Sequence, residues 1–140
     1  SEMCIRDSIN TALEIFSKMK MVVSYMESIS HDKHIAYVSH LSHLSSFMLG
    51  KTVMDEEESE KNIFDMAGSG FESTVRLAKS SPKMWTDIFD DNKVNVLKSL
   101  SDYINNLELI KDLIESNKFE ELESQLKKTN YIKKILKGIN

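Results

Sequence analysis

The sequence of 140 residues is poor in helix breakers, with one proline and four glycines. Proline lacks a backbone donor, and glycine loses much conformational freedom on folding, so both residues interrupt helices. Where they are this scarce, long helices joined by short connections are expected. We therefore predict a mostly α-helical fold, and the length corresponds to about one domain.

Other absences narrow the class of protein. The single cysteine, Cys4, cannot form an intramolecular disulfide, and no apolar run approaches the roughly 20 residues that span a bilayer. A net charge of -4 with 29% charged residues is typical of globular domains and gives no sign of nucleic-acid binding. Residues 1–8 have no basic segment followed by an apolar core, so they are not a secretory signal. We expect a cytoplasmic protein with no nucleic-acid or membrane partner.

Two short segments with different patterns open the chain. Apolar residues follow helical spacing over Ile9–Lys20, with Ser8 as a plausible N-cap. Met21–Met26 is rich in β-branched and aromatic residues, which suits a strand. The chain offers no second strand to pair with it, so we expect residues 1–28 to be the end of a preceding domain and residues 29–140 to be a helical domain.

A long buried helix is expected near the start of the helical domain. Ser30 can cap it, and apolar residues then continue to about Met54 around too much of the circumference for a helix with one wet face. If the helix continued through the acidic run Asp55–Glu58, these negative charges would lie unfavourably at the negative end of the helix dipole. We therefore expect the helix to end there and the acidic residues to form a solvated loop.

Turn residues divide the rest of the chain into further helices. Gly68-Ser69-Gly70 predicts a turn, and Ser80-Ser81-Pro82 predicts the end of one helix and the start of another with proline in its first turn. Apolar residues at spacings of three and four then predict helices over Pro82–Ser116 with a break near Asp91, Lys118–Lys128 and Tyr131–Lys137.

The four histidines raise the question of a metal site. His31 with His34, and His40 with His43, have spacings that could chelate on a helix. The nine-residue offset puts the two pairs on nearly opposite faces, and no nearby cysteine or carboxylate set completes either pair. We therefore expect no metal site, an exposed His34, and a shared face where His40 and His43 hydrogen-bond or contact a ligand.

Arg76 and Trp85 are the other candidate site residues. Arg76 lies between two apolar residues shortly after the glycine turn, and a buried guanidinium needs an anion. A substrate carboxylate and a structural ion pair with Asp or Glu both fit its planar fork, and the residues alone favour the ion pair. Trp85 fits either core packing or the wall of a pocket.

Two motif blocks carry a resemblance to a known family. The first is His-Asp-Lys-His-Ile-Ala-Tyr-Val-Ser-His-Leu-Ser-His from His31, and the second runs from Gly68 through Thr74-Val75-Arg76 and Met84-Trp85 to Phe89. They resemble the HDxxxAxxSHLxH and GGFxxxTRxAxSxPxMWxDIF runs in the carboxy-terminal half of prephenate dehydrogenases. The resemblance covers roughly Ile9–Leu136. It implies an all-α dimerisation domain of that type, preceded by one helix and one strand left over from a Rossmann-like domain.

The resemblance also implies roles for particular residues. Arg76 matches an arginine that binds the ring carboxylate of prephenate, and His43 matches a histidine that lines the substrate side of the pocket and is implicated in tyrosine feedback. Trp85 matches a tryptophan of the pocket wall, while His40 and His31 match supporting positions. The sequence departs from the family pattern near the pocket, at Ser42, Ser69, Glu72 and Ser73.

No GxGxxG turn follows a strand in this chain, so it has no motif for holding a dinucleotide. In the family, NAD or NADP and the catalytic residues belong to the amino-terminal domain. The resemblance therefore implies a homodimeric substrate-binding part of an NAD(P)-dependent oxidative decarboxylase that turns prephenate into 4-hydroxyphenylpyruvate in tyrosine biosynthesis. This part would be inactive alone, with prephenate and tyrosine as its ligands. A noncatalytic helical dimerisation or tyrosine-sensing module and an arogenate dehydrogenase remain alternatives.

Overall fold

The computed structural model describes residues 2–136, with side chains from Ile5 onward, and no strand occurs among them. The predicted all-helical class is confirmed. The chain divides into two compact units, one up to Lys33 and the other from His34. The elements are α1 (Glu2–Lys18), α2 (Ser28–Ile35), the π-helical turn η1 (Ala36–His40), α3 (Leu41–Ser59), the 3-10 turn η2 (Ile63–Met66), α4 (Ser69–Val75), the 3-10 turn η3 (Arg76–Lys79), α5 (Pro82–Asp91), α6 (Lys93–Glu115), α7 (Phe119–Thr129) and α8 (Ile132–Leu136).

The first unit differs from the sequence prediction in two ways. Helix α1 begins at Glu2 rather than near Ile9, because no glycine or proline stands before Ile9 to stop it. The strand predicted over Met21–Met26 is not formed, since residues 21–27 are in neither helix nor strand. A strand needs a neighbour for its backbone donors and acceptors, and residues 2–136 provide none.

The long helix expected from Ser30 consists of α2, η1 and α3 in immediate succession, and it begins at Ser28. The predicted end before the acidic run is wrong, because α3 continues through that run to Ser59. The acidic side chains have local partners: Asp55 pairs with Lys51 at 2.5 Å. The Glu57 carboxylate accepts the backbone N–H groups of Asn62 at 3.0 Å and Phe64 at 3.1 Å, so it stabilises the turn after the helix.

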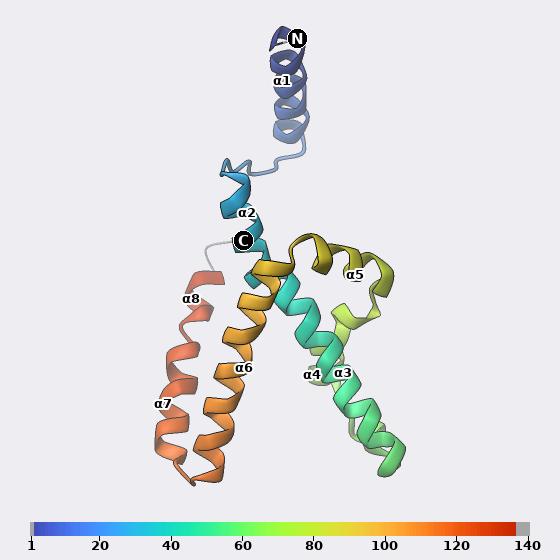
Figure 1. The fold of residues 1–140 in the computed structure, drawn as a ribbon, viewed down its shortest axis with the longest axis vertical. Helices are drawn as coiled ribbons and strands as arrows, with labels where there is room; N and C mark the ends of the chain where they lie inside the picture. The colour runs from blue at the N-terminus through green and yellow to red at the C-terminus, as the bar shows by residue number, and fades with distance from the viewer. Residues whose placement is uncertain (1, 137–140) are drawn as a thin grey trace. The chain divides into compact units, whose positions relative to one another are not determined.

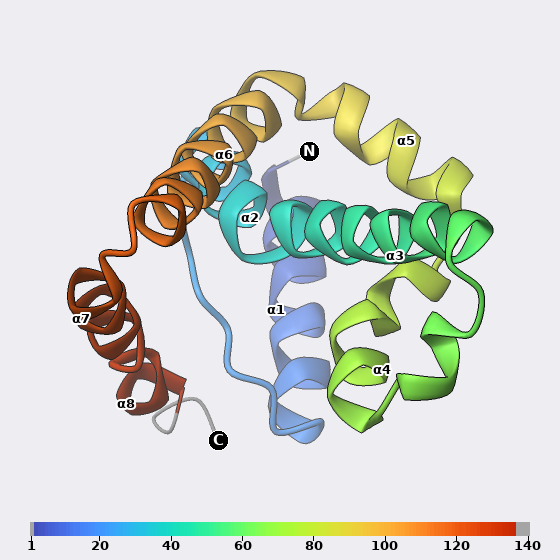
Figure 2. The ribbon, with the colours of Figure 1, turned by 90° about the horizontal axis from the view of Figure 1, so that it is seen from below.

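The predicted helix boundaries around Pro82 and Asp91 are confirmed. Ser81 is the N-cap of α5, its hydroxyl accepts the Met84 N–H at 3.4 Å, and Pro82 occupies the first turn. The break between α5 and α6 falls at Asn92, next to the predicted position. It divides the long apolar segment into two helices whose directions differ (Figure 2).

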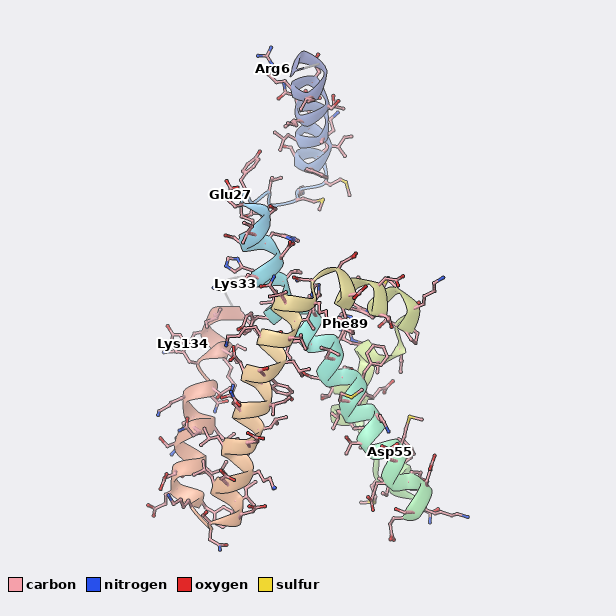
Figure 3. The ribbon with its side chains drawn as sticks, in the orientation of Figure 1. Arg6, Glu27, Lys33, Asp55, Phe89 and Lys134 are labelled. Atoms are coloured by element: carbon pink, nitrogen blue, oxygen red, sulfur yellow. The ribbon has the colours of Figure 1, made fainter. Side chains whose placement is uncertain are left out.

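In the second unit α3, α5 and α6 come together near η1, and Phe89 of α5 lies at this junction (Figure 3). Helix α4 packs beside α3, and α6 and α7 run side by side as a hairpin (Figure 1). The core is small: among the described side chains the buried apolar residues are Ala36, Trp85, Val96 and Leu113. Among residues 2–136 no helix is both long and apolar enough to cross a bilayer.

Candidate functional site

Three polar side chains of the η1–α3 segment, His40, His43 and Ser46, follow one another at intervals of three residues. Each contacts a different part of the chain that follows α3: His40 contacts the α5–α6 junction, His43 contacts α5, and Ser46 contacts the α4–η3 junction. One line of side chains therefore organises the segments that carry the other candidate residues.

His43 stacks on Trp85, with ring centroids 3.6 Å apart and planes 26° apart. Its Nδ1 lies 3.0 Å from the Ser39 carbonyl oxygen. A carbonyl oxygen only accepts, so Nδ1 carries a hydrogen in this bond and Nε2 is the acceptor of the neutral imidazole. The ring is thus held from two sides, and Nε2 is the nitrogen available to a further group.

Trp85 is 7% exposed, and it also lies near Phe89, with ring centroids 5.5 Å apart. Its indole Nε1 is buried and has no hydrogen-bond acceptor among the described residues. A buried donor without a partner is rare in folded proteins, because it loses its hydrogen bond to water. The indole N–H is therefore an unsatisfied donor among the described residues.

His40 is also buried, at 7% exposed. Its ring meets Trp85 edge-on at 6.0 Å and Phe89 at 6.4 Å between centroids. The Asn92 side-chain amide lies 3.4 Å from Nδ1 and donates to it. These contacts tie η1 to the break between α5 and α6.

Arg76 is the first residue of η3, and its side chain is exposed rather than buried as its apolar neighbours indicated. It forms no ion pair with the described carboxylates, whereas Lys79 on the same turn approaches Glu72 at 3.5 Å. The structural ion pair weighed from the sequence is therefore not formed among the described side chains. The guanidinium fork is open to an external anion.

His31 lies in the first unit, exposed, with Nδ1 3.1 Å from a carboxylate oxygen of Asp32. His40, His43 and Trp85 all belong to the second unit. No three described His, Cys, Asp or Glu side chains are arranged to hold a metal ion.

Sequence reasoning missed a polar tie between η1 and α6. The Tyr37 hydroxyl donates to one carboxylate oxygen of Asp102 at 2.6 Å, and Lys98 donates to the other oxygen. The hydrogen bonds from Lys98 and Tyr37 lower the pKa of Asp102. The bond to Asp102 raises the pKa of Tyr37, and it also raises the pKa of Lys98. The Lys98–Asp102 spacing of four was visible as a helical pair, but the contact with Tyr37 spans 65 residues and has no local signal.

The fold and the site define a helical domain with a histidine–tryptophan stack and an exposed arginine that is unpaired with the described carboxylates. The family model of the prephenate dehydrogenase dimerization domain matches residues 27–128. The chain belongs to this family.

Individual relatives agree with the family match. The chain is 29% identical to prephenate dehydrogenase of Bacillus subtilis in an alignment over 108 residues that covers 74% of this chain and 29% of that protein. A structure of prephenate dehydrogenase from A. aeolicus in complex with hydroxyphenyl propionate and NAD+ is similar with a TM-score of 0.82 and 33% identity, covering 94% of this chain and 46% of that one. Synechocystis arogenate dehydrogenase shares the fold, with a TM-score of 0.75 and 24% identity over 93% of this chain and 48% of that one. The chain thus spans less than half the length of these relatives.

Proposed function

We propose that this chain is the substrate-binding and dimerisation part of a cytoplasmic, NAD(P)-dependent prephenate dehydrogenase of tyrosine biosynthesis. The reaction is the oxidative decarboxylation of prephenate to 4-hydroxyphenylpyruvate. NAD or NADP binds to a nucleotide-binding domain outside these 140 residues, residues 1–28 belong to the end of that domain, and the chain alone is inactive. The observation that carries the proposal is the His43–Trp85 stack in a chain of this family.

The geometry suits a ligand with an aromatic or cyclohexadienyl ring and carboxylates. The unpaired guanidinium of Arg76 binds the ring carboxylate, because its planar fork donates two parallel hydrogen bonds to such a group. His43 offers Nε2 to the ligand side chain, since its Nδ1 is held by Ser39. Trp85 forms the wall behind His43 and has a spare indole N–H. The hydroxyphenyl propionate bound to the A. aeolicus relative supports a ligand of this kind.

The test is to measure the binding of prephenate to the 140-residue chain. Calorimetry gives the affinity, and the fluorescence of Trp85, the single tryptophan, gives a second measure of binding. We expect Arg76→Ala to weaken binding by about tenfold to a hundredfold, as is typical when a charge-assisted hydrogen bond is lost. Lys79→Ala is the matched control, because Lys79 is a cation of the same turn that approaches Glu72.

Unchanged prephenate affinity in Arg76→Ala would refute the substrate-site assignment. Arogenate is titrated in parallel, because the fold is shared with an arogenate dehydrogenase. Tighter binding of arogenate than of prephenate would favour an arogenate dehydrogenase. Binding of tyrosine alone would favour a noncatalytic sensing module.

We also propose that the chain forms a homodimer. The second unit buries few apolar side chains, while α6 leaves Val94 81%, Leu97 54% and Leu107 50% exposed. A monomer with so much apolar surface on one helix is expected to cover it by association.

A further inference from the structure

The junction between α4 and η3 contains an unusual replacement of a helical hydrogen bond. In a continuous α-helix the N–H of Ala78 would donate to the carbonyl oxygen of Thr74, four residues earlier. Here the hydroxyl of Ser46 stands between these two groups. It donates to the Thr74 oxygen at 2.9 Å and accepts the Ala78 N–H at 3.1 Å.

Insertion of this hydroxyl coincides with a bend in the backbone. Val75, the last residue of α4, has φ -88° and ψ 4°, whereas an α-helical residue has ψ near about -42°. A side chain that enters the helical hydrogen-bond ladder is a recognised cause of such a bend. Arg76 follows Val75 directly and lies midway in the sequence between Thr74 and Ala78, the two residues that Ser46 binds.

Ser46 itself is well placed to hold this geometry. It is 2% exposed on α3, one turn after His43, so water does not compete for its hydroxyl. Both hydrogen-bonding roles of the hydroxyl are used, and its backbone belongs to a long helix. Its position relative to His43 is therefore set by α3, and through it the start of η3 is set as well.

We propose that Ser46 is a positioning residue for Arg76. Its hydroxyl bends the α4–η3 junction and so sets the direction of the guanidinium relative to the His43–Trp85 stack. The consequence for binding rests on the proposed function, in which Arg76 receives a carboxylate of the ligand. Without the hydroxyl, Thr74 and Ala78 bond directly and straighten the turn, or remain unsatisfied, and in either case Arg76 shifts.

The first test monitors the Ala78 amide and the Arg76 side chain by NMR, and it needs no ligand. Arg76 and Arg6 are the arginines of the sequence, so the Nε–H signal of Arg76 is readily assigned by NMR. In the unaltered chain we expect the Ala78 amide to exchange slowly with solvent, as Ser46 accepts its hydrogen. Ser46→Ala should move the Ala78 amide and Arg76 Nε–H signals. Ser45→Ala is the matched control, because the Ser45 hydroxyl bonds only to Leu41 of its own helix.

The second test is a double-mutant cycle on prephenate binding. We expect Ser46→Ala to weaken binding by about tenfold, as a displacement near 1 Å of a binding group can do, and Ser45→Ala to have little effect. In the Arg76→Ala background the same change should have no further effect, because the two residues act through one contact. A role in stability alone would instead weaken binding equally in both backgrounds.

The outcomes separate the two proposals. A rapidly exchanging Ala78 amide, or an Arg76 signal that Ser46→Ala leaves in place, overturns the positioning role whatever the ligand does. If these signals move as expected but Arg76→Ala binds prephenate normally, the positioning of Arg76 stands and the proposed function fails.

Discussion

The Tyr37–Asp102–Lys98 group shows how single residues hold η1 against α6. Tyr37 lies in the π-helical turn, and Asp102 and Lys98 lie one turn apart on α6. The two hydrogen bonds to the carboxylate favour its ionised form and lower its pKa. The hydrogen bond from Tyr37 to Asp102 keeps the Tyr37 hydroxyl protonated and raises its pKa. The tie therefore depends on pH at both ends of the scale.

Asp102→Asn is expected to destabilise the chain at neutral pH but not in strong acid. The folded-state pKa of Asp102 is lowered, so its contribution is complete above the ordinary pKa of about 3.9 and is lost as the pH falls through the lowered value. The raised pKa of Tyr37 gives the opposite limit: the contribution holds below about pH 10 and is lost as the pH rises through the raised value.

Urea unfolding of Asp102→Asn and of the parent chain from pH 2 to pH 7 measures this difference, with Asp112→Asn on the same helix as control. If the stability difference between the parent chain and Asp102→Asn were the same at every pH, the ionisation of Asp102 would not contribute to stability.

At the scale of elements, helix ends depend on local partners that the sequence shows incompletely. The start of α5 follows from Ser81 and Pro82, which act within their own turn. The end of α3 depends instead on Glu57, whose carboxylate reaches forward to Asn62 and Phe64. Asn62 has a left-handed backbone with φ 78°, and this allows the chain to turn back toward Glu57.

Glu57→Ala should lower the free energy of unfolding by about 1–2 kcal/mol, because it removes a charge-assisted acceptor from two backbone donors. Glu58→Ala is the control and should change stability by less than about 0.5 kcal/mol, since Glu58 is exposed. Urea unfolding gives both values. Faster amide exchange at Asn62 and Phe64 should accompany the loss, and equal stabilities of the two variants would show that the carboxylate does not stabilise this turn.

At the scale of the whole molecule, the second unit leaves its apolar surface open. Val96 and Leu113 of α6 are buried within the unit, but other apolar residues of the same helix are exposed: Val94, Leu97, Ile104, Leu107 and Ile114. Helix α7 covers part of α6 and leaves its own Phe119 and Leu126 more than half exposed. A second copy of the chain would supply the surface that a single copy lacks.

Leu107→Glu should therefore convert a dimer into monomers, because it places a charge on the apolar face of α6. Light scattering at micromolar concentration measures the mass. Asn105→Glu introduces the same charge at a polar, exposed position of the helix and should remain dimeric. A parent chain that is monomeric under these conditions would contradict the homodimer.

The sequence predicted features that depend on neighbours within a few residues. Scarce breakers favoured helices throughout, and Ser81-Pro82 and Asp91 marked boundaries close to those observed. The motif with His40, His43 and Trp85 identified side chains that do come together. Met21–Met26 failed as a strand because strand formation depends on a partner, which local composition does not reveal.

Arg76 illustrates what only the tertiary structure decided. Its apolar neighbours indicated burial, yet Arg76, which directly follows the bend at Val75, is exposed and unpaired with the described carboxylates. That bend depends on Ser46, which is 28 residues away from Thr74 in the sequence. By itself the sequence determined the helices and the family motifs, because propensity, capping and spacing act locally. The direction of Arg76 depended on the tertiary structure, because a single hydroxyl from another helix replaces the local hydrogen bond.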